Sequence, residues 1–301
     1  MRAMFQVNPT KTQPVVELEQ LVREERWAEL QAEVLKHEPA ELAAVLQRLP
    51  EKQQRRLFAM VPEQRAAQVL PYLPYFEQFV LLRARPRVET AQIVNEMEPD
   101  ERMRLLDELP QSSWEQLIAE LSPEERKITD QLASYPRESV GRYMTPAFIA
   151  LDEESTAVQA LELVRSEGRT KETVDVTYVL DGEGRLVGEV RLGSLVMARP
   201  EQKVRELCDL SPLAVKDSDR LDEVVELFEK YARLALPVVD DAGKMLGIVT
   251  VDDVMDVARR MATREMQKFG GMEALDAPYF AVGFWQMLKK RGSWLALLFF
   301  G

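Results

Sequence analysis

The sequence is poor in the residues that build disulfides and transition-metal sites. It has one cysteine, Cys208, and one histidine, His37, in 301 residues. A single cysteine excludes an internal disulfide and fits a reducing compartment, and a single histidine excludes a centre built from several histidines. No catalytic triad order and no phosphate-binding glycine loop is present, so we expect no enzyme. We expect Cys208 to pack as a small apolar side chain and His37 to be solvated on a polar helical segment.

Positive charge and long apolar runs are also scarce. The net charge of −12 excludes the basic surface that nucleic acid binding needs. The apolar run near the end of the chain, Trp294 to Phe300, is far shorter than the roughly 20 residues of a membrane span. It follows Lys289-Lys290-Arg291, an order typical of a helix entering a membrane from the cytoplasm. We expect 292–301 to be the cut start of a first transmembrane helix, with a buried helix end or interface patch as the alternative.

Prolines recur at a nearly constant spacing in the first half of the chain. Most are followed by acidic residues, as in Pro50-Glu51 and Pro99-Asp100-Glu101, which suits the first turn of a helix. Each unit carries one apolar stripe that a single short helix cannot bury, so we predict a stacked helical array over about 15–134. A helical adaptor that binds another protein is the alternative. The prolines are Pro39, Pro50, Pro62, Pro74, Pro86, Pro99, Pro110 and Pro123.

The second half of the chain holds two copies of a strand–turn–strand pattern. Leu236 to Val239 and Leu246 to Val251 are short apolar runs around an Asp-Asp-Ala-Gly turn, and 178–190 repeats the plan. A glycine within the last run, Gly247, predicts that another backbone or a ligand comes close. We expect Asp252 or Asp253 to cap the helix that follows. We also predict one helix in each copy, over 156–167 and 221–231.

These residues resemble those of a known family. Met144-Thr145-Pro146 and the Leu236–Val254 stretch resemble a tandem of CBS domains, and specifically the pair in MgtE magnesium channels. The helical array resembles the N-domain of the same family. The resemblance implies a mixed fold: an all-α superhelical N-domain of short helices, an α/β tandem CBS pair and a C-terminal connecting helix. The implied boundaries are disorder at 1–14, the N-domain at 15–138, CBS domains at 139–205 and 206–262, and the connecting helix at 263–291.

Carboxylates are the side-chain groups of this chain that suit ligand binding. Mg²⁺ prefers oxygen ligands, and acidic faces repel each other unless a cation lies between them. In the family, acidic residues of the N-domain and the CBS pair hold Mg²⁺ between them. Matched by segment, the resemblance implies Asp100, Asp222, Asp253, Asp256 and Glu265 as the candidate ligands.

The sequence also departs from the family pattern. Gln68 and Ala232 stand where the better-known members carry acidic residues, and the stretch after Asp256 is basic. We therefore expect fewer or weaker Mg²⁺ sites than in those members. As an alternative, the arginines at 259, 260 and 264 form salt bridges with facing carboxylates and so replace the ions.

The family resemblance implies ATP as a second candidate ligand. CBS pairs bind adenine nucleotides between their halves, where an Asp after the last strand holds the ribose. Thr250 and Asp253 fit that pattern in the second half, whereas Ser194 stands at the matching place in the first. A hydroxyl lacks the charge-assisted strength of a carboxylate.

Taken together, the resemblance implies the Mg²⁺-sensing cytosolic region of an MgtE-type channel at the inner face of the cell membrane. It would close the pore when Mg²⁺ is plentiful, with its own membrane pore and a second copy, paired through the CBS domains, as partners. The alternative is a CBS module that senses adenine nucleotides for another transporter or enzyme.

Overall fold

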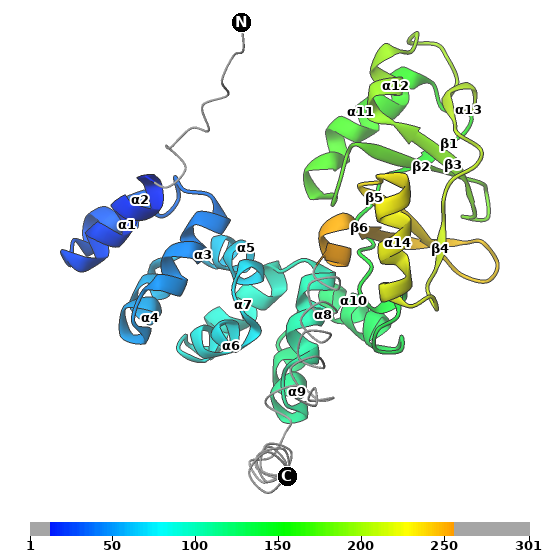
Figure 1. The fold of residues 1–301 in the computed structure, drawn as a ribbon. Helices are drawn as coiled ribbons and strands as arrows, with labels where there is room; N and C mark the ends of the chain where they lie inside the picture. The colour runs from blue at the N-terminus through cyan, green and yellow to red at the C-terminus, as the bar shows by residue number, and fades with distance from the viewer. Residues whose placement is uncertain (1–12, 256–301) are drawn as a thin grey trace, which may run out of the picture. The chain divides into compact units, whose positions relative to one another are not determined.

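The computed structural model describes residues 13–255, and its internal contacts divide the chain into two units, 1–126 and 127–301. The described part of unit 1 is helical, and unit 2 contains two three-stranded sheets (Figure 1). This confirms the predicted mixed fold of a helical array followed by a pair of α/β halves. The predicted connecting helix (263–291) and membrane entry (292–301) lie outside the described residues. None of the helices within 13–255 has both the length and the apolar character to cross a membrane.

Unit 1 is a succession of short helices, each too short to be stable alone. They stack so that their apolar stripes, including Leu42, Leu46, Leu57 and Leu70, are buried together. The elements are α1 (Gln13–Arg23), α2 (Trp27–Glu33), α3 (Pro39–Arg48), α4 (Glu51–Met60), α5 (Glu63–Val69), η2 (Leu70–Tyr72), α6 (Tyr75–Arg83), α7 (Arg87–Glu96), α8 (Pro99–Asp107), α9 (Gln111–Ala119) and α10 (Pro123–Ala133).

Every one of the eight spaced prolines marks the start of a helix. Pro39, Pro99 and Pro123 are first helical residues, as the sequence predicts, while the others lie one residue earlier, at the N-cap. Pro50, for example, has φ −60° and ψ 147°, and its carbonyl accepts the first hydrogen bonds of α4. Proline suits both places because its φ is preset and it has no N–H to satisfy.

The start of unit 1 differs from the expectation. The helical periodicity over 15–35 is divided between α1 and α2, because the chain turns at Glu25, where φ is +54°. Helix α1 already begins at Gln13, two residues before the predicted boundary. The prediction of a solvated His37 is wrong. His37 lies in the bend before α3, its side chain is 15% exposed, and its Nδ1 lies 3.3 Å from Glu41 Oε2.

Unit 2 consists of two halves with the same topology. In each half the first strand pairs parallel with the second, and the second pairs antiparallel with the third. The first half contains η3 (Val140–Arg142), β1 (Ala150–Asp152), α11 (Ala157–Glu167), η4 (Gly168–Thr170), β2 (Val176–Leu180), β3 (Leu186–Arg191) and α12 (Leu192–Met197). The second contains α13 (Val204–Leu207), β4 (Val215–Lys216), α14 (Leu221–Tyr231), β5 (Ala235–Val239) and β6 (Met245–Thr250).

The two helices predicted for these halves are confirmed. Helix α14 spans 221–231, and α11 spans 157–167 with Thr156 as its N-cap. Thr156 and Gln159 form a capping box, in which each side chain accepts a hydrogen bond from the other's backbone N–H.

The halves are interlocked by their leading segments. Thr145, between η3 and β1 of the first half, pairs antiparallel with Ile248 on β6 of the second half. In the same way Asp209 pairs with Glu189 on β3 of the first half. An apolar cluster of Tyr178, Ala235, Met245 and Ile248 joins the two halves. Because each sheet is extended by the other half's segment, neither half is complete by itself.

The segment after α10 is tied to this module. Arg142 Nη1 donates to the carbonyl oxygens of Ala133 and Tyr135, at 2.8 and 2.9 Å, and so caps the C-terminal end of α10. The N–H groups of Val140 and Gly141 donate to the carbonyls of Asp219 and Asp217, ahead of α14. The end of α10 is therefore part of unit 2.

Candidate sites for a divalent cation and a nucleotide

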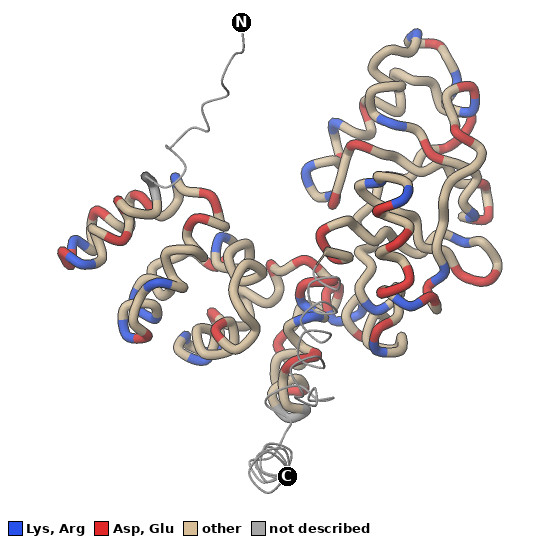
Figure 2. Tube along the Cα trace, viewed as in Figure 1, with Lys and Arg blue, Asp and Glu red and all other residues tan. Residues whose placement is uncertain are grey.

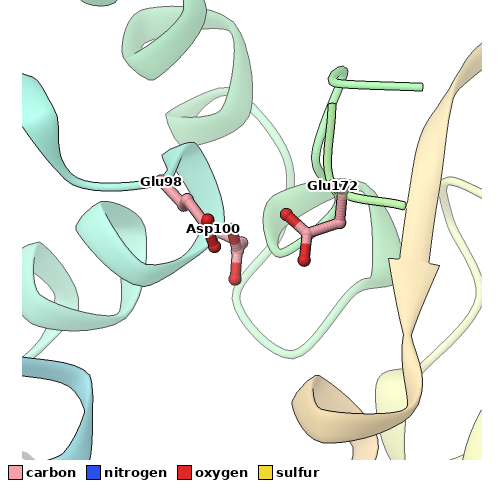
Figure 3. Close-up of side chains that lie close together, drawn as sticks. All are labelled: Glu98, Asp100 and Glu172. Carbon is pink, nitrogen blue, oxygen red and sulfur yellow. The ribbon is translucent and has the colours of Figure 1, made fainter. Parts of the chain in front are cut away.

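Three carboxylates gather at the start of α8 in unit 1. Glu98 is the N-cap residue, Pro99 begins the helix, and Asp100 and Glu101 lie in its first turn. Figure 3 shows Glu98 and Asp100 on this turn. A carboxylate oxygen of Asp100 lies within 4.8 Å of one on Glu98, and likewise within 4.8 Å of one on Glu101. The sequence predicts Asp100 as a candidate, but neither Glu98 nor Glu101.

The electrostatics of this turn favour a cation. The N–H groups at a helix start interact favourably with negative charge. Two such charges about 5 Å apart still repel by roughly 3 kcal/mol at an effective dielectric constant of 20. Within the same helix, Arg104 Nε lies 4.0 Å from Glu101 Oε1, which is a long contact for an ion pair. A hard divalent ion would relieve the repulsion more fully.

Unit 2 has an acidic loop side chain of its own that sequence patterns do not reveal. Glu172, also labelled in Figure 3, lies between η4 and β2, where the chain has no helical or strand periodicity. Its N–H donates to the carbonyl oxygen of Ala147 at 2.8 Å, which fixes the backbone of this loop. No signal in the sequence separates it from other loop acids.

Thr250 and Asp253 form a joined pair where β6 runs into the next helix. The Asp253 Oδ2 atom accepts hydrogen bonds from the Thr250 N–H, at 3.0 Å, and from the Thr250 hydroxyl, at 2.8 Å. Thr250 therefore occupies the N-cap and Asp253 reaches back to it, one half of a capping box. The predicted capping role of Asp253 is thus modified. Thr250 occupies the N-cap position, and the Asp253 carboxylate accepts hydrogen bonds from Thr250. The Thr250 hydroxyl also contacts Asp252 Oδ1.

Asp222 is already paired within its own helix start. Both of its oxygens accept from Arg220, at 3.0 Å from Nε and 2.9 Å from Nη2. Hydrogen bonding to Arg220 lowers the pKa of this carboxyl below its ordinary value. Among residues 13–255, Asp222 belongs to no group of three acidic side chains close enough to share an ion.

Figure 2 shows that acidic residues are prominent along α14 and that charges of both signs are mixed elsewhere in both units.

The first half has no carboxylate at the position that corresponds to Asp253. There β3 ends at Arg191 and Ser194 takes the place of Asp253, and both are exposed. The remaining predicted ligands, Asp256 and Glu265, lie outside the described residues, as do the arginines at 259, 260 and 264.

Comparisons with known proteins match both units. Residues 37–138 match the family model described as the MgtE intracellular N domain. Residues 140–201 and 204–260 each match the model of the CBS domain.

Two curated relatives and two solved structures extend this similarity. The magnesium transporter MgtE of Thermus thermophilus is 35% identical over 173 residues, or 58% of this chain, and that of Bacillus subtilis is 31% identical over 177 residues, also 58%. The chain covers 38% of the length of either relative. The soluble part of a magnesium transporter superposes with a TM-score of 0.76 at 25% identity, covering 83% of this chain and 99% of that one. The cytosolic domain of the Mg²⁺ channel MgtE in complex with ATP gives 0.75 at 30% identity, covering 81% and 99%.

Proposed function

Because this chain consists of an MgtE intracellular N domain and a tandem CBS pair and is homologous to the MgtE magnesium transporters, we propose that it is the cytosolic regulatory region of an MgtE-type Mg²⁺ channel. It senses Mg²⁺ and closes a pore when the ion is plentiful. The acidic turn at the start of α8 is the observation that carries the sensing role, because it concentrates hard oxygen ligands in the N domain.

The mechanism is electrostatic. Asp100, with Glu98 and Glu101, gives the N domain a group of carboxylates, and Asp253 gives the CBS module another carboxylate. These charges repel one another without a divalent ion, and a bridging Mg²⁺ ion offsets that repulsion. Asp256 and Glu265 remain proposed ligands on the same basis. Asp222 is the weakest of the set, since a cation would compete with Arg220 for both of its oxygens.

The free energy needed to close the pore requires more than one bound ion. Moving a two-state equilibrium from mostly open to mostly closed takes about 5 kcal/mol of differential binding. A single exposed site, screened by water and salt, supplies only a fraction of this. Several weak sites that are completed only in the closed state supply it together.

The test compares Mg²⁺ responses of the whole chain. Small-angle scattering and limited proteolysis are followed from metal-free buffer to high Mg²⁺ at constant ionic strength. We expect the wild type to become more compact and more resistant, and D100N/D253N to lose most of this response. The control E96Q/E206Q removes the same charge from two exposed positions, one in each unit, and should respond like the wild type. An unchanged radius of gyration in the wild type rejects the switch.

The proposed partners are a membrane pore and a second copy of the chain. Two large apolar side chains, Val196 and Met197, are 60% and 86% exposed on α12, which supports a contact between CBS modules. Light scattering should show a dimer for the wild type and a monomer for M197E.

A second candidate function is nucleotide sensing. It is favoured by the Thr250–Asp253 pair and by the ATP complex of a related cytosolic domain. Calorimetry with ATP and with Mg²⁺ separately distinguishes the two functions, since a pure nucleotide sensor gives heat with ATP alone and no compaction with Mg²⁺.

A further inference from the structure

The helices of unit 1 from α3 to α7 form two layers. Helix α3 contacts α5 and α5 contacts α7, whereas α4 contacts α6 (Figure 1). The ends of α4 and α6 are tied together, because Arg85, just after α6, donates to the carbonyl oxygens of Phe58 and Val61. Since α4 and α6 lie in one layer, their sides turned away from the α3–α5–α7 layer form a single surface, which we call the outer face.

On α4 the outer face is basic. Lys52, Arg55 and Arg56 are all exposed, and their spacing of three and four residues places them on one side of the helix. The Arg56 guanidinium lies over the Trp27 ring, 4.1 Å from its centroid, and is held there. Three cationic side chains are therefore presented together.

On α6 the outer face is aromatic and apolar. Phe76, Phe79, Val80 and Arg83 follow the same helical spacing, and the opposite side of the helix is buried in unit 1. The Phe76 side chain is 54% exposed, and the Arg83 guanidinium lies 5.5 Å from the centroid of the Phe79 ring. A helix that is apolar on both sides suits an apolar environment beyond its own domain.

The charge of the outer face is opposite to that of the whole chain. Helices α4 and α6 together carry four basic residues and two acidic ones, whereas the chain has a net charge of −12. Of the two acids, Glu51 pairs with Arg55 and Glu77 is half-buried. A large anionic surface is therefore attracted to this face and repelled by the molecule as a whole, which orients it.

We propose that the outer face of α4 and α6 docks on the surface of an anionic lipid bilayer. The basic side chains of α4 contact phosphate headgroups, and Phe76 reaches the boundary with the acyl chains. Basic residues beside exposed aromatic ones are the combination that binds membrane surfaces. The apolar row favours a bilayer over an acidic protein, because a bilayer offers anionic groups and hydrocarbon at adjoining depths. This inference goes beyond the proposed function, since it concerns a lipid contact and not the response to Mg²⁺.

A fluorescent label at one position tests the contact. Cys208 is the only cysteine, so an environment-sensitive nitrobenzoxadiazole label can be placed at a chosen site in a C208S background. A59C carries the label on the exposed side of α4, and Q64C carries it on α5, exposed in the other layer. The labelled full chain is mixed, in metal-free buffer, with vesicles of phosphatidylcholine alone or with about 30% phosphatidylglycerol.

We expect the label at position 59 to brighten and shift to shorter wavelength with the anionic vesicles only, and high salt to reverse the change. The label at position 64 should not respond. Adding K52Q/R55Q to A59C should weaken vesicle binding about tenfold or more. The control R165Q/R191Q, which removes the same charge from exposed positions of unit 2, should have no effect.

The aromatic contribution is tested in the same assay. F76S should weaken binding several-fold, and V88S, which alters a 69% exposed side chain on α7, should not. Circular dichroism checks that each variant is folded. An equal response at positions 59 and 64, an equal response to neutral vesicles, or equal effects of K52Q/R55Q and R165Q/R191Q overturns the proposal. Vesicle binding through another part of the chain, such as the basic and apolar stretch 289–300, leaves the label at 59 unchanged and likewise overturns it.

Discussion

The carbonyl oxygen of Thr145 lies 2.6 Å from the point where a Cβ atom on Gly247 would sit. The sequence predicts that another backbone or a ligand approaches this glycine, and the structure shows a backbone: the leading segment of the first half crosses β6 of the second. The other half repeats the arrangement, since a Cβ on Gly188 would come 2.4 Å from the carbonyl oxygen of Asp209. Both glycines are therefore required by the interlocking of the halves.

Replacing Gly247 by alanine should destabilise unit 2. The new methyl group cannot move away from a backbone atom without shifting the strand, which typically costs about 1–3 kcal/mol. Urea unfolding should show a lower midpoint for G247A. The control is G182A, in a hairpin turn where a Cβ would meet nothing within 4 Å, and its midpoint should stay near that of the wild type. Equal effects of the two substitutions would contradict the interlocked packing.

A substitution at Ala232 should have the opposite effect. Ala232 closes α14 in the left-handed conformation, with φ +48° and ψ +44°, which disfavours any residue with a Cβ. We expect A232G to stabilise the protein by about 0.5–1 kcal/mol, seen as a higher melting temperature. Ala59, exposed within α4, is the matched control, because A59G should cost about 1 kcal/mol. Destabilisation by both would show that Ala232 is not strained.

Local rules were sufficient to predict much of this fold. The spaced prolines mark every helix start from α3 to α10, because proline's restrictions act within a few residues. The hairpins of both halves follow from short apolar runs around Asp/Gly turns. The break between α1 and α2 could not be predicted, since the helical periodicity continues across Glu25, where the backbone adopts a positive φ.

The candidate sites were less predictable than the fold. Asp100 stands in a recognisable Pro-Asp-Glu helix start, but the proximity of Glu98 depends on the N-cap geometry. The ion pair between Glu189 and Arg233 joins residues 44 positions apart, and no local pattern reveals it. Long-range pairing of charges is decided by tertiary packing, which sequence spacing does not encode.

Asp222 should show a pH signature that depends on Arg220. Its folded pKa is lowered, so the ion pair contributes stability above the unfolded value near 3.9, and this is lost as pH falls through the folded pKa. We expect R220Q to raise the pKa of Asp222 in an NMR titration. The cost in stability at pH 7 should be about 0.5 kcal/mol for this partly exposed pair, and it should vanish at pH values below the folded pKa of Asp222. If D222N/R220Q loses as much stability as the two single variants added together, the pair contributes no coupling energy.

The acidic turn of α8 leads to the last prediction. If Asp100 binds Mg²⁺ as proposed, removing the charge of Glu98 should weaken that binding, because Glu98 supplies one of the carboxylates within 4.8 Å of Asp100. We expect E98Q to raise the Mg²⁺ concentration for half-maximal protease protection by about three- to tenfold. Glu96 lies two residues earlier and is exposed at the end of α7, so E96Q makes the same change in net charge outside the turn. Its midpoint should stay close to the wild-type value. Equal shifts for the two variants would mean that Mg²⁺ responds to the overall charge of the N domain, and that Glu98 belongs to no site.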